Sequence, residues 1–518
     1  MARHRPRLLG VGAALLASSV AACSGSAGGP RPAAPTTAPT TAATAATTAP
    51  GSTRASGGAP AVHWVRCTGS AGPPGYQCAT VAVPRDPADP GLGTIAMALD
   101  RHPATGSKIG SLLINPGGPG ASGVDALPDI VSLMPPGLLE RFDIVGFDPP
   151  GVARTAPIIC LGSAGLERYF HLDPEPTTAA GFDRIVAEDR TFAQGCEARS
   201  GAELPYVSTH DAAEDMDVVR RALGDARLSY LGLSYGTLLG ATYAGLFPTH
   251  VRAMVLDGAL DPALPVLPEL DQQSAGLDAQ LRQFFAQCTR QPSCGWKPSG
   301  DPAAAFDALL ARVRAHPLPA EGTSRTVGPS ELLYGTAAAL YSTSTWNDLG
   351  YALQQASHGD GTVLLELFDA YTGRQPNGSY SNLFEANAAI NCLDTPSPTI
   401  AQIRAAVPAA EAAAPVFGVQ NLYSQVGCAV WPVPATGKVG PIRAAGSPPI
   451  VVVGSTGDPI TPYRWAQSLA SELSNAVLLT RVGDGHTAYG YSSCIRSAVD
   501  RYLIDLTPPA AGTRCPSD

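Results

Sequence analysis

Residues 228–237 read LSYLGLSYGT and place Ser234 between Gly232 and Gly236, directly after an apolar run. The run predicts a buried strand, and TLLGATYAGLFP, from Thr237, predicts a helix that ends at Pro248. A Gly-x-Ser-x-Gly sequence between strand and helix is typical of a nucleophile elbow, in which small neighbours allow a tight turn that exposes the serine hydroxyl. The alternative is that Ser234 is one more small residue in a chain rich in glycine and serine. The flanking strand and helix favour a nucleophile.

Further apolar runs are bounded by glycine, proline or aspartate, as buried parallel strands tend to be. They are SLLINPGGPG from Ser111, FDIVGFDPPG from Phe142, VRAMVLDGAL from Val251, PPIVVVGSTGDP from Pro448 and NAVLLTRVGDGH from Asn475. DAAEDMDVVRRALG, from Asp211, has early acids, late arginines and a closing glycine, which predicts a helix. Alternating strands and helices predict an α/β fold with a mostly parallel central sheet.

A serine nucleophile requires a histidine base, and the histidine requires an acid that orients it. In this architecture the acid and the histidine follow the serine in that order, each after a later strand. Asp458 follows IVVVGSTG and His486 follows VLLTRVGDG, so we predict the triad Ser234, Asp458 and His486. Asp484 is a second candidate acid. In the structural alternative, Asp458 caps a turn and His486 is an ordinary loop residue.

An oxyanion that forms on the substrate needs two backbone N–H donors. The first expected donor is the amide of Tyr235, which directly follows the nucleophile. The second is expected from the glycine-rich loop NPGGPGASG, from Asn115, where Gly118 is the best candidate. A flexible turn is the alternative explanation for this loop.

The 518 residues exceed what one typical domain needs. Residues 262–446 are far longer than a strand connection requires, and DAQLRQFFAQC from Asp278 and DPAAAFDALLARVRAH from Asp301 show helical periodicity. We predict a large, mainly helical cap at 262–446, inserted between core segments 61–261 and 447–518. An independent inserted domain is the alternative.

The N-terminus predicts export. Arginines precede an apolar stretch from Leu8 to Val20, which is typical of a signal peptide over residues 1–22. VAAC ends at Cys23 and resembles a bacterial lipobox, so we expect a lipid on Cys23 and an anchor in the membrane. Residues 23–60 are rich in Ala, Thr and Pro and predict a disordered tether. The protein is expected at the outer face of the plasma membrane, in the envelope or secreted; an ordinary secretory signal is the alternative.

Cysteine usage agrees with an oxidising compartment, since the chain holds 11 cysteines. Setting Cys23 aside, pairing neighbours along the sequence suggests five disulfides, which are Cys67–Cys78, Cys160–Cys196, Cys288–Cys294, Cys392–Cys428 and Cys494–Cys515. A zinc site is the rival explanation, but the sequence has neither CxxC nor HExxH. The formal net charge is −9 and no broad basic stripe is present, which argues against a nucleic-acid partner.

Several of these motifs together carry a resemblance to a known family. NPGGPG, GFDPPGVART, YLGLSYGT, GSTGDPITP and GHTAYG resemble the secreted tripeptidyl aminopeptidases of actinobacteria, over about Val62 to Cys515. These are α/β-hydrolase serine peptidases related to prolyl iminopeptidases. The resemblance implies the α/β-hydrolase fold, the same triad and release of short peptides, tripeptides in particular, from free N-termini. Pro150 and Thr155 depart from the arginine and serine usual in the family's DPRGxGxS-like loop.

The resemblance implies peptide or protein substrates, and no metal or organic cofactor. We expect a monomer. A lipase or carboxylesterase with the same triad is the alternative activity, and a non-catalytic envelope protein is a third. An aminopeptidase must bind a free ammonium group, and a covered pocket needs a carboxylate to do so. EANAAINCLD in the cap offers Asp394, with Glu385 as the alternative; a solvated surface acid is the structural explanation.

Overall fold

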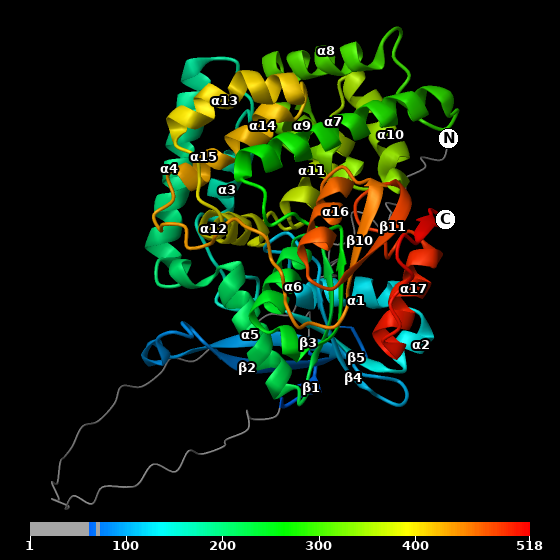
Figure 1. Ribbon diagram of the computed structural model, residues 1–518. Coiled ribbons are helices and arrows are strands. Elements are labelled where there is room, and N and C mark those ends of the chain that lie inside the picture. The colour runs from blue at the N-terminus through cyan, green and yellow to red at the C-terminus, as the bar shows by residue number, and fades with distance from the viewer. Residues whose placement is uncertain (1–61, 69–72) are drawn as a thin grey trace, which may run out of the picture.

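The computed structural model of the chain describes residues 62–68 and 73–518 (Figure 1). The expected signal peptide at 1–22, the lipidated Cys23 and the tether at 23–60 lie outside these residues. Within the described part of the chain, no helix combines the length and the apolar character that crossing a membrane requires.

The core is a mostly parallel sheet of ten strands in the order β1-β2-β3-β5-β4-β6-β7-β10-β11-β12. The pairs from β1 to β5 along this order are antiparallel, and all later pairs are parallel. The fold class predicted from the apolar runs is thereby confirmed. The strands are β1 (Val65–Arg66), β2 (Gln77–Pro84), β3 (Thr94–His102), β4 (Gly110–Asn115), β5 (Phe142–Phe147), β6 (Leu228–Leu233), β7 (Val251–Asp257), β10 (Ile450–Gly457), β11 (Ala476–Asp484) and β12 (Arg514–Pro516).

Helices cover both faces of this sheet, which explains why its central strands are almost continuously apolar. Along β7, Met254 and Leu256 pack in one hydrophobic cluster while Ala253 and Val255 pack in another, because alternate residues point to opposite faces. One face carries α1 (Gly123–Leu133), α2 (Pro136–Leu139) and α17 (Ser493–Asp505), and the other carries α5 (Thr209–Ala222), α6 (Tyr235–Leu246) and α16 (Tyr463–Glu472).

The helix predicted from Asp211 is α5, which begins two residues earlier, at Thr209. Ser208 accepts from the amide of Asp211, and the Asp211 carboxylate accepts from the amide of Ser208, which forms a capping box. Arg220 and Arg221 lie in the last turn, where basic side chains complement the helix dipole.

A second layer of helices lies over one end of the sheet, between β7 and β10 in the chain (Figure 1). It holds one two-stranded sheet and is otherwise helical, as the sequence predicts for the cap. Its elements are α7 (Val266–Arg290), α8 (Pro302–Ala315), β8 (Leu318–Pro319), β9 (Thr326–Val327), α9 (Pro329–Leu340), α10 (Trp346–Ser357), α11 (Thr362–Thr372), α12 (Leu383–Asp394), α13 (Ile400–Ala413), α14 (Gly418–Tyr423) and α15 (Gln425–Ala429).

Two helices outside residues 262–446 also belong to this layer. They are α3 (Ser163–Phe170) and α4 (Ala179–Ser200), which the sequence analysis placed within the first core segment. Phe182 and Ile185 of α4 pack in one cluster with Ile403, Leu422 and Val426 of the cap. The apolar side of α4 is thus buried against cap helices that are distant in the sequence.

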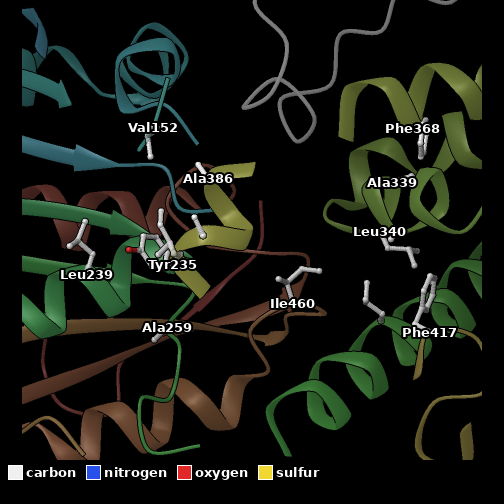
Figure 2. Packing of buried hydrophobic residues seen from close by; sticks show 14 of the residues in the cluster. Val152, Tyr235, Leu239, Ala259, Ala339, Leu340, Phe368, Ala386, Phe417 and Ile460 are labelled. Atoms are coloured by element: carbon white, nitrogen blue, oxygen red, sulfur yellow. The ribbon is translucent and has the colours of Figure 1, made fainter. Parts of the chain in front are cut away.

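One hydrophobic cluster runs through both layers (Figure 2). Tyr235 and Leu239 contribute from the sheet side, and Leu340, Phe368 and Phe417 from the cap. The cap is therefore packed onto the core by shared apolar burial rather than only tethered to it.

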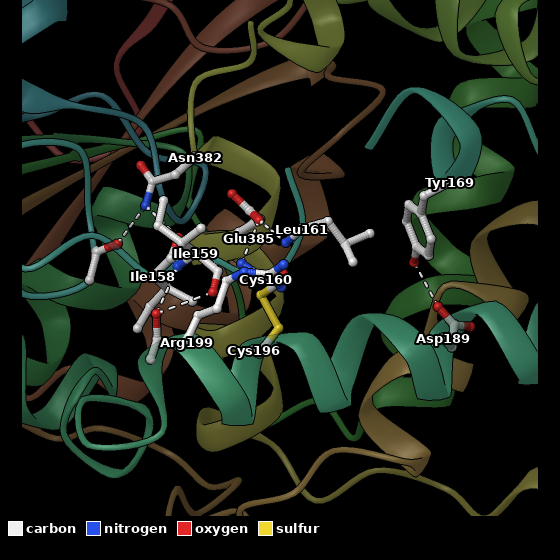
Figure 3. The surroundings of a disulfide bond; sticks show 12 residues. Ile158, Ile159, Cys160, Leu161, Tyr169, Asp189, Cys196, Arg199, Asn382 and Glu385 are labelled. Carbon is white, nitrogen blue, oxygen red and sulfur yellow. Dashed lines mark hydrogen bonds between the residues drawn. A yellow bond between two sulfur atoms is a disulfide. The ribbon is translucent and has the colours of Figure 1, made fainter. Parts of the chain in front are cut away.

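The structure joins the cysteines in the five pairs expected from their order along the chain. They are Cys67–Cys78, Cys160–Cys196, Cys288–Cys294, Cys392–Cys428 and Cys494–Cys515. Cys160–Cys196, shown in Figure 3, ties the segment after β5 to α4, and Cys392–Cys428 ties α12 to α15. Two of the bridges thus fasten helices of the cap layer.

Candidate active site

Ser234 occupies a tight turn between β6 and α6. Its backbone has φ 55° and ψ −124°, which is unusual for a residue other than glycine. A Cβ atom added to Gly232 would lie 2.3 Å from the carbonyl oxygen of Gly236, and one added to Gly236 would lie 2.8 Å from that of Asn115. Both glycines are required for the chain to turn here, which is the geometry of a nucleophile elbow.

Asp458 and His486 meet at the carboxyl ends of β10 and β11. His486 Nδ1 lies 2.9 Å from Oδ1 and 3.0 Å from Oδ2 of Asp458. The Asp458 side chain is fully buried, and that of His486 is 8% exposed. Because an ionised carboxylate can only accept, Nδ1 carries the proton and Nε2 is left as the basic nitrogen.

The free side of the imidazole faces the same cavity as the elbow. His486 Nε2 is buried and has no hydrogen-bond partner among the described residues. His486 and Ser234 both line a cavity of about 1360 Å³. A buried, basic nitrogen without a partner can take a proton from a hydroxyl that lines the same cavity, once a substrate brings the two groups together.

The alternative acid, Asp484, has another partner. With its amide nitrogen turned toward the carboxylate, Gln283 donates to Asp484 Oδ1 at 3.0 Å and to Oδ2 at 3.2 Å. The carboxylate bound to His486 is that of Asp458, and we therefore keep Asp458 as the proposed acid.

The two expected oxyanion donors come from the elbow itself and from a loop beside it. Tyr235 is the first residue of α6, and such a residue has an N–H without an intrahelical acceptor. Gly118 lines the cavity and has φ +108°. A Cβ on the preceding Gly117 would lie 2.7 Å from the Leu233 oxygen and 2.9 Å from the Cβ of Ser234, so this loop packs directly on the elbow.

The same loop contacts the cap. The side-chain amide of Asn387 in α12 donates to the carbonyl of Pro119 at 3.0 Å. A Cβ on Gly120 would lie 2.6 Å from the carbonyl oxygen of Leu383. The glycines thus let the cap approach the loop that carries the expected second oxyanion donor.

Of the two acids considered for amine binding, only Asp394 lines the cavity. Its Oδ1 accepts from the amide of Thr209 at 2.8 Å, and its Oδ2 accepts from the Thr209 hydroxyl. The Thr209 hydroxyl also contacts the hydroxyl of Tyr235. Burial, in the first place, raises the pKa of Asp394 to about 6.

Glu385 is buried elsewhere. Its Oε1 accepts from the amides of Cys160 and Leu161 at 2.6 and 2.9 Å, as Figure 3 shows. Glu385 therefore fastens α12 to the segment that carries the Cys160–Cys196 bridge. The structure thus separates the two acids, of which one faces the cavity and the other supports the cap.

The sequence analysis missed several residues that support His486. Thr461 donates from its hydroxyl to Asp458 Oδ2 at 3.1 Å and lies 3.4 Å from His486 Nδ1. The backbone N–H of His486 donates to the carbonyl of Tyr341 in the cap at 2.8 Å, and the two rings meet edge to face. The Asp-x-x-Thr spacing could have indicated Thr461, but nothing local indicates Tyr341.

Asp257 is a further buried acid that the sequence analysis did not single out. It ends β7, and its Oδ2 accepts from the amides of Ala488 and Tyr489 at 3.0 and 2.8 Å. Burial, as the largest effect, raises the pKa of Asp257 to about 6. The carboxylate therefore holds the loop that follows His486. The position of Asp257 at the carboxyl end of a predicted strand could have indicated this role from the sequence.

The departure from the family pattern at Thr155 has a structural role. Thr155 is buried, and its hydroxyl oxygen accepts from the amide of Ala98 at 2.9 Å. The threonine thus ties the loop after β5 to β3, and it makes no contact with the triad residues.

Among the described residues, two groups of side chains lie close enough to share a metal ion. One consists of Cys67, Cys78 and Asp100, but its cysteines form a disulfide. The other consists of His210, Asp211 and Glu214 near the start of α5, where Asp211 already caps the helix. Neither group contains a residue of the triad.

Known proteins resemble this chain over most of its length. A family described as TAP-like protein matches residues 414–515. The chain is 39% identical to serine protease Hip1 of Mycobacterium tuberculosis over 478 residues, which cover 88% of this chain and 91% of that protein. It is 38% identical to carboxylesterase B of the same organism over 461 residues, covering 85% and 86%. It is 32% identical to the tripeptidyl aminopeptidase of Streptomyces lividans over 470 residues, covering 86% and 84%.

Proposed function

Because this chain belongs to the tripeptidyl aminopeptidase family of α/β-hydrolase serine peptidases, we propose that it releases short peptides, tripeptides above all, from free N-termini. The observation that carries the proposal concerns His486, which is bound to Asp458 through Nδ1. Its Nε2 has no hydrogen-bond partner among the described residues, and His486 lines the same cavity as Ser234. The substrates are peptides or proteins with an accessible N-terminus.

The proposed reaction proceeds through an acyl-enzyme. Ser234 Oγ attacks the carbonyl carbon of the scissile amide while His486 Nε2 takes the hydroxyl proton. The amides of Tyr235 and Gly118 donate to the oxyanion that forms. His486 then gives the proton to the leaving nitrogen, the C–N bond breaks and the rest of the peptide leaves, while the tripeptide unit remains as an ester on Ser234.

Water completes the cycle. It attacks the ester carbonyl while Nε2 takes one of its protons, and the proton returns to Ser234 Oγ as the tripeptide leaves. The Asp458 carboxylate holds the imidazole in one tautomer and stabilises the imidazolium. Thr461 and the backbone of Tyr341 support this arrangement.

The cap is the basis for proposing a preference for chain ends. Cap residues line the cavity that contains Ser234, and we propose that they hinder the middle of a folded chain from reaching it. We propose that Asp394 binds the substrate ammonium, because its carboxylate faces the cavity while Glu385 is occupied by backbone amides. A carboxylate there offsets the cost of desolvating the charged amine.

The peptidase proposal is tested with a peptide of four or more residues, offered with a free and with an acetylated N-terminus. We expect a tripeptide from the free form by mass spectrometry and little product from the acetylated form. Asp394→Asn should raise KM for the free peptide far more than for the acetylated one. Equal losses on both would assign Asp394 a structural role only.

Ester hydrolysis is the second candidate, favoured by the 38% identity to a protein named carboxylesterase B. The same triad cleaves esters and amides, so the substrate decides. Rapid cleavage of acyl esters with no tripeptide released from any free peptide would establish this alternative.

For location, we propose export and anchoring through a lipid on Cys23, with the enzyme outside the plasma membrane and monomeric. Cys23→Ala should leave the folded enzyme active and move it from the membrane to the medium or leave it as precursor. Normal processing with unchanged membrane association would exclude lipidation at Cys23.

A further inference from the structure

One acid in the cavity wall lacks any partner. Glu269 lies in the first turn of α7 and lines the cavity. Its carboxylate makes neither a hydrogen bond nor a salt bridge with any described residue. By contrast, Asp458 and Asp394, the other acids discussed at this site, are held by several donors.

A second acid lies next to it. Asp261 also lines the cavity, and burial together with the charge of Asp261 raises the pKa of Glu269 to about 7. Lys438 and Arg443 line the cavity too, yet neither forms a salt bridge with these two acids. A partly buried carboxylate beside a like charge is unfavourable unless a cation comes to it.

The position of Glu269 places such a cation in the same cavity as Ser234 and His486. Gln273 follows it by about one turn, or 6 Å of helix. The Gln273 amide donates to the carbonyl of Ile460 at 3.0 Å, and the amide of Ile460 donates to Asp458. Glu269 therefore lies roughly one helical turn beyond the loop that orients His486.

Part of the surrounding wall is apolar. Leu264, Val266 and Leu270 line the cavity near Glu269 in the chain, and Ile442 lines it from the segment that follows the cap helices. An acid within apolar walls suits a side chain with a long methylene stem and a charged end, as in lysine and arginine.

We propose that Glu269, assisted by Asp261, binds the cationic side chain of a lysine or arginine in the peptide substrate. This inference rests on the proposed peptidase function and names its preferred substrates. Asp394 remains a separate anchor for the N-terminal ammonium, since it lies beside Thr209 and Tyr235 rather than beside Asp261.

The test uses fluorogenic tripeptide amides in which lysine or norleucine occupies each of the three positions in turn. Norleucine keeps the stem and removes the charge. The wild type should prefer lysine at one position by about tenfold or more in kcat/KM, which matches one charge-assisted hydrogen bond. Glu269→Gln should remove this preference while leaving norleucine substrates nearly unchanged.

Asp271→Asn is the matched control, because Asp271 lies on the same helix but does not line the cavity. It should keep the preference for lysine. No preference for lysine at any position, or the same preference in Glu269→Gln, would overturn the proposal. An equal loss on lysine and norleucine amides would make Glu269 an anchor for the N-terminal amine instead, and would also overturn it.

A separate readout keeps the inference distinct from the peptidase proposal. If only esters are cleaved, competition against a small acyl ester replaces the amides. N-acetyl-lysine amide should then inhibit the wild type about tenfold better than N-acetyl-norleucine amide, and Glu269→Gln should lose the difference. Equal inhibition by both compounds in the wild type would refute the cation site whatever the enzyme cleaves.

Discussion

Replacing Asp458 by asparagine isolates the role of one carboxylate. Its two oxygens accept from the amides of Ile460, Thr461 and Thr487, from the Thr461 hydroxyl and from His486 Nδ1. Asparagine keeps one acceptor oxygen and puts an NH₂ group in place of the other. That NH₂ group donates to His486 Nδ1 and so stabilises the tautomer in which Nε2 carries the proton. In this tautomer Nε2 cannot act as a base.

The expected loss in kcat is about 10⁴-fold, as a wrong imidazole tautomer produces in comparable triads. The free energy of unfolding should fall only modestly. If the new NH₂ group takes the place of Oδ2, the amide of Thr487 loses its acceptor, which costs about 1–3 kcal/mol. The Thr461 hydroxyl can rotate and accept from the new group, so this bond survives.

The assay pairs kcat on a fluorogenic tripeptide amide with thermal unfolding, and Asp484→Asn serves as the control. The carboxylate bound to His486 is that of Asp458, whereas Asp484 accepts from Gln283, so this variant should keep kcat within a few fold. Near-normal kcat in Asp458→Asn, with a large loss in Asp484→Asn, would refute the assignment of the acid.

Three further predictions concern the loop, the cap and the pH response. Gly117→Ala should abolish most activity, because the new Cβ would clash with Leu233 and Ser234 and the backbone φ is +104°. In the control, Gly224→Ala, the φ is +78° but the space around the new Cβ is open, so the variant should lose only about 1–2 kcal/mol of stability. Glu385→Ala should lower the free energy of unfolding by about 2–4 kcal/mol, since two buried amides lose their acceptor, and should leave the preference for free over acetylated N-termini unchanged. Ammonium binding needs ionised Asp394, whose pKa is about 6, so KM for free peptides should rise as pH falls through 6 while KM for acetylated peptides stays flat; a parallel rise in both would contradict this.

The sequence predicts those parts of the molecule that local patterns encode. Apolar runs ending in glycine or aspartate mark the strands, and Ser234, Asp458 and His486 follow them at the carboxyl ends. Because parallel strands all end at one edge of the sheet, the order of these residues already predicts that they converge.

Contacts between distant segments could not be predicted in this way. Nothing near Tyr341 indicates that its carbonyl accepts from His486, and nothing near Phe182 indicates that α4 is covered by cap helices. The two acids of α12 illustrate the same limit. Glu385 and Asp394 are both acids of the same helix. Only the packing of the folded chain turns one toward Cys160 and the other toward the cavity.

The measurement that tests the central proposal most directly is labelling with a fluorophosphonate, followed by mass spectrometry of the digested protein. We expect one adduct per chain, on the peptide that contains Ser234, and prior incubation with a cleavable free peptide should slow its formation. Ser234→Ala should show no adduct. Absence of labelling in the wild type, or equal labelling in Ser234→Ala, would contradict the proposal that Ser234 is the nucleophile.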